Sequence, residues 1–514
     1  MTIRWCTPVA FAVNMGCSPA CKQGTVFSVG TLLLLGGVLA GLFWSDVADY
    51  IYRSQLSLSP SSTGFRMWRE TPIPMYLQIY FFNWTNPDEV KAGKAKPIVY
   101  EVGPYTYLEK HTRVNMTWHP ENDTISFQQI REWHFDPSKS SGSPDDVIQS
   151  LNVLAATIAE KVKNFRPIVK KVVNVLLNVE EPFAVKKTVR ELLFDGYSDP
   201  ILNVASELKK ITNISIPFDK FGWFYDRNMS STYDGSFNMF TGQQNMSNLG
   251  NVHSWNYATH TSYFDGKCGD VKGTTGELLP PLVDSEKLSV FATDLCSTVS
   301  LSRSEELVQK YGIEGVKFQG DAREFDNGTL HPEYKCYSYE GKTMPSGVRD
   351  MSKCRYGAPA YVSFPHFLDA DPWYTNSVDG LHPNRSIHEF FVNAEPSTGL
   401  PLEVRAQLQI NVLLQPIKGL TMYEKVPKVL MPMFYFRQTA ELTPDLGSQV
   451  KLLLNLSRIG TITFYGLAGI GGLLLAIATF ITIRGHWGED DDTVALINSK
   501  RESSNKPASS NPTV

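Results

Sequence analysis

Two uncharged apolar runs, one near each end of the chain, constrain what this sequence can fold into. The first reads GTVFSVGTLLLLGGVLAGLFW over residues 24–44, and the second reads IGTITFYGLAGIGGLLLAIATFITI over residues 459–483. A helix rises about 1.5 Å per residue, so each run is long enough to cross a hydrocarbon core of about 30 Å. The sequence therefore predicts membrane-spanning helices at 23–44 and 459–483.

The N-glycosylation acceptors of the form Asn-x-Ser/Thr all lie between these two runs. They are Asn83, Asn115, Asn122, Asn213, Asn228, Asn245, Asn327, Asn384 and Asn455. Acceptors are used in the secretory lumen, so this distribution predicts one extracellular or luminal domain at 45–458 and cytosolic tails at 1–22 and 484–514. Arg4, Lys22 and Arg484 agree with positive residues staying on the cytosolic side.

The first apolar run has a second reading as a cleaved signal peptide. Val38-Leu39-Ala40 resembles a cleavage site. However, the run is longer than the apolar segment of about 7–15 residues that signal peptides carry, so an uncleaved anchor is favoured.

The seven cysteines divide between two redox environments. Cys6, Cys17 and Cys21 precede the first run, where they are candidates for S-palmitoylation, although free cytosolic thiols fit equally well. The other four fall in the predicted luminal domain, where disulfides persist: Cys268, Cys296, Cys336 and Cys354. Four cysteines allow three pairings, and their spacing does not choose among them.

The segment between the runs is typical of one large α+β domain, because no linker or repeat divides it. Period-two or aromatic-rich stretches predict strands at 72–82, 98–102, 105–108, 125–135 and 405–415, with a turn at Gly103-Pro104. Apolar residues at helical spacing over 151–177 predict two helices that break at Pro167, and 188–194 continues the helical pattern. We expect a mostly antiparallel sheet or barrel with an inserted helical cluster at about 151–194.

This helical insert is basic, with eight Lys or Arg against four Glu. It is either a solvated helix face or a docking surface whose positive potential attracts anionic ligands. The candidate docking residues are Lys161, Lys163, Arg166, Lys170 and Lys171. A net charge of −4 for the whole chain gives no indication of a nucleic-acid partner.

Sequence patterns of catalysis are missing from the chain. It has neither a G-x-S-x-G nucleophile elbow nor an H-E-x-x-H zinc helix, and the P-loop-like Gly341-Lys-Thr343 has Cys336 where the first glycine belongs. His366 and His388 have no partner at ligand spacing, so we expect core or loop histidines. A two-helix ecto-nucleotidase would need phosphate-binding loops and more cysteines. We therefore expect a protein that is not an enzyme and holds no metal or cofactor.

Two shorter patterns suggest contacts at and below the membrane. Gly37 and Gly41 form a small-xxx-small pair that lets helices approach closely, and a dimer contact through it would make a homo-oligomer. In the C-terminal tail, Asp492 precedes Leu496-Ile497 as in dileucine signals read by clathrin adaptors, although a chance acidic tail explains the pattern equally well. The placement beside a membrane helix favours endocytic or lysosomal sorting.

Several longer stretches together resemble the class B scavenger receptors, and the insect members are closest in style. The stretches are Met67-Trp-Arg69, Pro72-Ile-Pro74, Tyr80-Phe-Phe-Asn-Trp-Thr-Asn-Pro87, Gly103-Pro-Tyr105, Arg190-Glu-Leu-Leu193, Gly196-Tyr197, Phe240-Thr-Gly242, Pro365-His-Phe-Leu368, Asp371-Pro372, Gly380-Leu-His-Pro-Asn384 and Pro396-Ser-Thr-Gly-Leu-Pro401. The resemblance implies an antiparallel β-barrel ectodomain with a helical cap at 151–194 and an apolar tunnel toward the membrane. It also implies the pairings Cys268–Cys336 and Cys296–Cys354.

The same resemblance implies a function and its alternatives. It predicts a plasma-membrane receptor that binds lipid-bearing, lipoprotein-like or anionic particles at the cap and passes fatty acid, sterol or carotenoid through the tunnel. The alternative is a receptor that binds a protein cargo and sorts it to endosomes or lysosomes. Two departures limit the transfer of sites: Ser338 replaces a cysteine of a third bridge found in some members, and residues 178–182 lack their lipid-reactive lysine.

Overall fold

The computed structural model describes residues 19–180, 182–203, 219–338, 344–485 and 487. The chain divides into two compact units, residues 1–52 together with 450–514, and residues 53–449. The predicted residues Cys6, Cys17, Asn213, Asp492, Leu496 and Ile497 lie outside the described residues.

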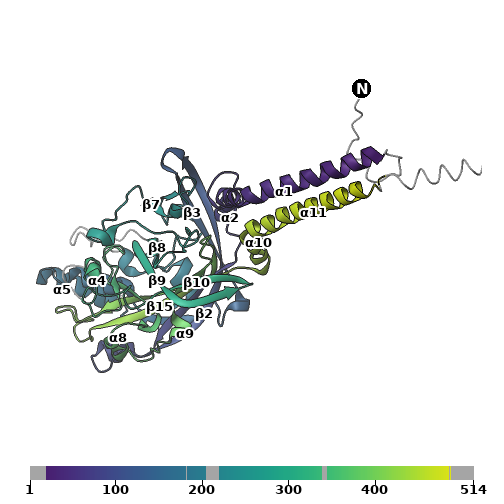
Figure 1. Cartoon of the computed structure of the whole chain (residues 1–514). Coiled ribbons are helices and arrows are strands. Elements are labelled where there is room, and N and C mark those ends of the chain that lie inside the picture. Colours follow the sequence, from purple (N-terminus) through teal and green to yellow (C-terminus); the bar gives the residue numbers. More distant parts are fainter. Residues whose placement is uncertain (1–18, 181, 204–218, 339–343, 486, 488–514) are drawn as a thin grey trace, which may run out of the picture. The chain divides into compact units, whose positions relative to one another are not determined.

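The first unit is built on two long apolar helices, α1 (Pro19–Leu56) and α11 (Leu456–Arg484). Both contain a predicted run and extend past it, and both are long and apolar enough to cross a membrane. The two helices run side by side (Figure 1) and touch through glycine, since a Cβ atom on Gly37 would lie 2.7 Å from the Ala468 nitrogen. Trp44 Nε1 also donates to the Leu456 carbonyl over 3.1 Å. Gly37 therefore serves a contact within the chain.

The second unit is a nearly closed antiparallel barrel. Among the described residues one sheet contains thirteen strands, in the order β7-β6-β3-β2-β1-β15-β14-β13-β10-β9-β8, with β12 paired to β14 and β11 to β12. Their bounds are β1 Met75–Trp84, β2 Val99–His119, β3 Thr124–Phe135, β6 Phe237–Phe240, β7 Val252–Trp255, β8 Lys287–Ala292, β9 Ser297–Lys310, β10 Ile313–Gln319, β11 Arg349–Asp350, β12 Ala360–Ser363, β13 Phe391–Ala394, β14 Pro401–Leu414 and β15 Val429–Glu441. This confirms the antiparallel barrel that the sequence predicts.

The two end strands of this sheet are joined by a single residue. Thr274 forms an antiparallel bridge with Asn251, next to β7, and a parallel bridge with Val290 in β8. The Phe291 N–H donates to the Thr274 carbonyl over 2.8 Å. The Thr274 backbone thus satisfies some of the N–H and C=O groups at the two open edges of the sheet. These edges therefore offer fewer free groups for pairing with strands of another chain.

The turn predicted at Gly103-Pro104 is wrong, because β2 continues through both residues. The pairing of β1 with β2 shifts register between Ile79 and Phe81 instead, which makes a bulge. Gly103 has a φ of 137°. A Cβ atom there would lie 2.6 Å from the Ile79 carbonyl oxygen, so only glycine fits this bulge.

The inserted cluster at 151–194 is partly helical and partly β-structure. Helix α4 (Val153–Val162) begins at Asn152, whose side chain accepts the Ala155 N–H over 3.0 Å, and α5 (Pro167–Glu180) starts at the predicted break. The strands β4 (Val147–Leu151) and β5 (Ala184–Thr188) pair beside them. Thr188 ends β5, and the helical structure predicted for the rest of 188–194 is present, with 189–190 leading into a π-helix at Glu191–Asp195. Within this unit α4 and α5 lie at one end of the barrel and form the cap (Figure 1).

The remaining helices are short and connect the strands. They are α2 Thr63–Arg69, α3 Pro87–Lys91, α6 Pro200–Asn203, α8 Pro372–Ser377, α9 Arg385–His388 and α10 Pro444–Leu454.

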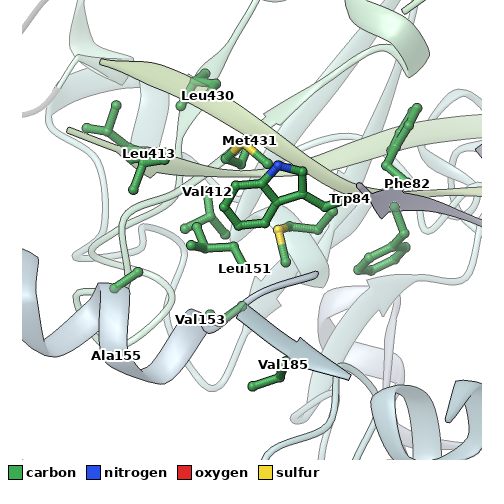
Figure 2. Packing of buried hydrophobic residues seen from close by; sticks show 14 of the residues in the cluster. Phe82, Trp84, Leu151, Val153, Ala155, Val185, Val412, Leu413, Leu430 and Met431 are labelled. Atoms are coloured by element: carbon green, nitrogen blue, oxygen red, sulfur yellow. The ribbon is translucent and has the colours of Figure 1, made fainter. Parts of the chain in front are cut away.

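A large apolar cluster joins the cap to the barrel. The indole of Trp84 lies among Val412, Met431 and Leu151 (Figure 2), and its side chain is about 1% exposed. Val153, at the start of α4, is also buried in this cluster. Burial of such a large ring contributes several kcal/mol, because each Å² of apolar surface removed from water contributes about 25 cal/mol. The cap is therefore anchored to the barrel by its first residues.

Candidate functional site

An apolar cavity of about 210 Å³ lies between α4 and the barrel. Helix α4 contributes Val153, Leu154, Thr157 and Lys161, and the segment 220–227 closes another side. The barrel strands contribute Leu77, Trp133, Tyr361, Ile410, Phe434 and Phe436. Apolar and aromatic walls with a few polar groups are typical of sites for small apolar ligands.

A buried ion-pair network borders this cavity. Arg227 donates to Asp294 over 2.9 Å and to Asp234 over 2.8 Å, and Arg131 lies 3.0 Å from Asp234. Burial raises the pKa of Asp294, but the attraction of Arg227 and its neighbours outweighs this effect and holds the pKa well below its usual range. These arginines and carboxylates neutralise one another and hold the segment 227–234 against β3.

Glu109, which also lines the cavity, belongs to a second buried network. His111 contacts Glu109 through Nε2 and lies 2.6 Å from Glu277 through Nδ1. Burial lowers the pKa of His111, but the two carboxylates outweigh burial and raise it above the ordinary value. With both ring nitrogens facing carboxylates, His111 is held as the imidazolium. Arg113 completes the network through its contact with Glu277.

The five basic residues predicted for docking separate into three groups. Lys161 lines the cavity. Lys163 is paired with Glu160, and Lys170 Nζ donates to the Lys418 carbonyl over 3.2 Å. Arg166 and Lys171 are exposed at the outer face of the cap. The structure therefore does not place all five in one surface patch.

The outer face of α5 combines exposed apolar and basic side chains. Ile168, Val172 and Val175 are 67%, 43% and 61% exposed, and their spacing puts them in one stripe. By helical spacing Lys171 borders this stripe, and Arg166 is exposed just before the first residue of α5. This stripe was not predicted, because the apolar spacing over 151–177 identified the helices and not which of their faces is exposed.

A second, open cleft contains His366 and His388, which the sequence gave no reason to place together. Both imidazoles are buried, as expected for core histidines. However, they are partners of each other, and one ligand atom each of His366, His388 and Glu101 lie within 4.8 Å of one another. His366 Nε2 is 2.7 Å from the Glu101 carboxylate. The sequence shows only that each histidine lies in its own motif-like stretch, at 365–368 and 380–388. These two stretches become neighbours only in the folded barrel.

The hydrogen bonds of these histidines do not fit a metal. His366 Nδ1 accepts the His382 N–H over 3.0 Å, and His388 Nδ1 accepts the Asn384 N–H over 3.1 Å. In neutral imidazoles the protons then sit on Nε2, the nitrogens that would have to bind the ion. Metal-binding histidines instead donate from their second nitrogen. His366 therefore donates from Nε2 to Glu101, and neither neutral imidazole offers an unprotonated Nε2 to a metal ion.

Both disulfides implied by the resemblance are present. The Cα atoms of Cys268 and Cys336 are 5.8 Å apart, and those of Cys296 and Cys354 are 6.2 Å apart. The bridges close loops on the side of the barrel formed by β8–β10 and tie them to the apolar cluster around Val299.

The acceptor asparagines and the remaining N-terminal cysteine occupy varied environments. Asn115, Asn122, Asn228, Asn245 and Asn384 are exposed. Asn327 is half-buried, with its side-chain nitrogen donating to the Met344 carbonyl over 2.9 Å, and Asn83 donates to the Tyr100 hydroxyl. Cys21 lies in the first turn of α1 and is disulfide-bonded, so acylation of its thiol would require the reduced form.

Comparison with known proteins covers nearly the whole chain. Residues 28–482 match the model of the CD36 family. The chain is 35% identical to Protein peste of Drosophila melanogaster over 88% of its own length and 81% of that protein. It is 32% identical to Scavenger receptor class B member 1 of Cricetulus griseus, over 89% and 88% of the two chains. It is 29% identical to Lysosome membrane protein 2 of Rattus norvegicus, over 92% and 97%.

These matches span both apolar helices and the whole barrel with its cap, and they confirm the resemblance inferred from the short motifs. The chain belongs to the CD36 family, the family of the class B scavenger receptors.

Proposed function

We propose that this protein is a membrane receptor that captures lipid-bearing or anionic particles at its cap and passes lipid through the barrel toward the membrane. The observation that carries this proposal is the apolar cavity between α4 and the barrel. One of the similar proteins is named as a scavenger receptor, which supports a receptor rather than an enzyme.

The physical advantage of an apolar path is large. A sixteen-carbon chain costs on the order of 13 kcal/mol to move into water, at about 0.8 kcal/mol per CH₂ group. Aromatic walls such as Trp133 and Phe434 keep the chain away from water, so this cost is avoided. Transfer then needs no nucleotide, because lipid moves down its own gradient.

The outer face of the cap suits capture of a particle. Ile168, Val172 and Val175 present apolar surface, and Arg166 and Lys171 present positive charge. Surfaces of this kind bind anionic lipid layers through buried apolar area and electrostatic attraction together.

The proposal is tested by identifying the lipids that co-purify with the full-length chain in nanodiscs. Ile410 lines the cavity and is only partly buried, so Ile410→Trp should fill the void with little disturbance of the core. Mass spectrometry should find fatty acids, sterols or carotenoids enriched in the wild type over Ile410→Trp. Identical lipid content in the two proteins would contradict a lipid-binding cavity.

A second function, cargo binding with endolysosomal sorting, is favoured by Asp492 and Leu496-Ile497 in the C-terminal tail. A similar protein is named as a lysosome membrane protein. Replacing Leu496 and Ile497 by Ala should hold the protein at the cell surface. An unchanged distribution between surface and lysosome would exclude this signal.

A further inference from the structure

The open cleft that contains His366 and His388 takes no part in the proposed lipid path. It has a volume of about 720 Å³, within the range of about 300–1,000 Å³ common for ligand sites. Its wall forms where the loop after α8 crosses the start of β2. The Val99 N–H donates to the Asp379 carbonyl over 2.9 Å, and a Cβ atom on Gly380 would overlap the Val99 carbonyl. Only glycine allows this close approach, so the backbone holds the cleft in a fixed shape.

One hydrogen-bond donor of this cleft lacks an acceptor. His388 is 4% exposed, and its Nδ1 accepts the Asn384 N–H over 3.1 Å, which leaves the proton of the neutral ring on Nε2. Burial and the neighbouring His366 lower the pKa of His388 to about 4, so the ring is neutral at neutral pH. In the part of the chain that the structure describes, this Nε2–H has no acceptor. A buried donor without an acceptor is unfavourable, so a ligand that accepts a hydrogen bond would stabilise the site.

A carboxylate acceptor lies beside this donor. One oxygen of Glu101 and one ring nitrogen of His388 are within 4.8 Å of each other. The carboxylate accepts from His366 Nε2 over 2.7 Å, and its side chain is still 34% exposed. Burial raises the pKa of Glu101, but the contact with His366 outweighs burial and lowers it, so the group is ionised at neutral pH. A carboxylate has about four lone-pair positions, so some remain for a ligand.

A donor and an acceptor side by side suit hydroxyl groups, which accept and donate at once. Glu101 would repel an anion, and Arg385, which lines the same cleft, would repel a cation. The Tyr100 ring, which is 51% exposed and fixed by the hydrogen bond between its hydroxyl and Asn83, adds a flat apolar face to the cleft. A ring that carries hydroxyl groups at its edge and apolar C–H groups on its face is a sugar.

The chain carries a glycan acceptor at the wall of this cleft. Asn384 lines the cleft and is exposed. Its side-chain oxygen accepts the Ser386 N–H over 3.1 Å and the Ser386 hydroxyl over 2.8 Å. Its Nδ2, the atom that bears an N-linked glycan, donates to no group among the described residues, so a glycan there breaks no hydrogen bond. At Asn83 and Asn327, by contrast, Nδ2 already donates to another group.

We propose that this cleft is a carbohydrate site and that the core sugars of the N-linked glycan on Asn384 occupy it. The hydrogen bond between the Asn384 N–H and His388 holds the attachment point next to the donor without an acceptor. A ligand tethered at the wall reaches the cleft at a high effective concentration, so even a weak site is filled. The glycan then rests on Tyr100, accepts from His388 and donates to Glu101. This proposal is independent of the lipid cavity, and the failure of either leaves the other intact.

The test measures how fast endoglycosidase H removes each glycan from the native full-length chain in nanodiscs. The enzyme cuts between the first sugars of the core, so a core held in the cleft is cut only after it leaves. The chain is produced with uniform oligomannose glycans, and glycopeptide mass spectrometry follows Asn384 and Asn245, an exposed acceptor outside the cleft. Tyr100→Ala removes the apolar face and His388→Phe removes the donor. Tyr257→Ala is the control, at an exposed tyrosine outside the cleft.

In the native wild type, Asn384 should lose its glycan about 10-fold more slowly than Asn245, and unfolding the chain should remove this difference. Tyr100→Ala and His388→Phe should each speed cleavage at Asn384 roughly fivefold, the effect of losing one hydrogen bond or a similar apolar contact. Tyr257→Ala should change neither site, and circular dichroism confirms the fold of each variant.

Three results would overturn the proposal. The first is an Asn384 that carries no glycan, and the second is a native Asn384 glycan that is cut as fast as the one on Asn245. The third is slow cleavage at Asn384 that persists unchanged in both Tyr100→Ala and His388→Phe, because contacts outside the cleft would then protect the glycan.

Discussion

The imidazole rings of His366 and His388 are stacked, with centroids 4.4 Å apart and planes 10° from parallel. Each ring accepts a backbone N–H through Nδ1. His388 cannot add a proton there without losing its hydrogen bond to the Asn384 N–H, which makes this residue sensitive to acid.

The first prediction concerns stability at acid pH. Burial and the neighbouring His366 lower the pKa of His388 to about 4, whereas a histidine in the unfolded chain titrates near 6.5. Between these values the unfolded chain binds a proton that the native state does not. The free energy of unfolding should therefore fall as the pH falls from about 6.5 toward 4.

Urea unfolding at neutral and mildly acidic pH tests this expectation. His388→Phe keeps a stacking ring without a titrating group, so it should lose less stability on acidification than the wild type. His382→Phe, which removes an exposed imidazole of the same cleft, should behave as the wild type. If acidification lowers the free energy of unfolding equally in all three proteins, groups other than His388 cause the acid sensitivity.

The second prediction concerns the buried network at Glu277. Glu277→Gln should destabilise the barrel by about 3–5 kcal/mol, because it leaves the buried Arg113 and the imidazolium of His111 short of negative charge. Thermal unfolding of the purified chain measures the change. Glu314→Gln, at an exposed position, should change stability by less than about 0.5 kcal/mol. A loss no larger than that of this control would show that the network contributes little.

The third prediction concerns the bulge in β2. Gly103→Ala should lower the unfolding free energy by about 1–3 kcal/mol, because the backbone conformation excludes a side chain and the new methyl group meets the Ile79 carbonyl. Gly266→Ala is the matched control, since Gly266 also has a positive φ but no atom near its missing Cβ. Thermal midpoints should rank wild type first, Gly266→Ala second and Gly103→Ala last. Equal thermal midpoints for the two variants would show that the contact between the new methyl group and the Ile79 carbonyl does not lower stability.

The fourth prediction concerns particle capture by the cap. The double change Arg166→Gln and Lys171→Gln should lower binding of anionic liposomes by roughly 30-fold, at about 1 kcal/mol per lost charge, and salt should reduce the difference. Both side chains are exposed, so folding should be unaffected. Lys94→Gln serves as the control for a lost charge outside the cap. Retention of full binding by the double variant would exclude this face as the capture surface.

Much of this architecture could be predicted from the sequence because its signals are local. The uncharged runs predict α1 and α11, the alternating stretch at 125–135 predicts β3, and Pro167 marks the break between α4 and α5. Local patterns failed where tertiary pairing overrides propensity. Gly103-Pro104 is typical of a turn, but pairing of Val102 and Tyr105 with β1 on either side of the bulge keeps β2 extended there.

The sequence by itself determined the two apolar spans, the mixed strand and helix content, and the family, because periodicity, lack of charge and motif order are properties of neighbouring residues. Only the tertiary structure decided that Thr274 joins the ends of the sheet, that His366 meets His388 and Glu101, and that Lys161 faces a cavity. Each depends on segments far apart in the chain whose distance is fixed by barrel closure. The environment of Lys161, beside Gly357 and apolar walls, arises only when those segments pack together.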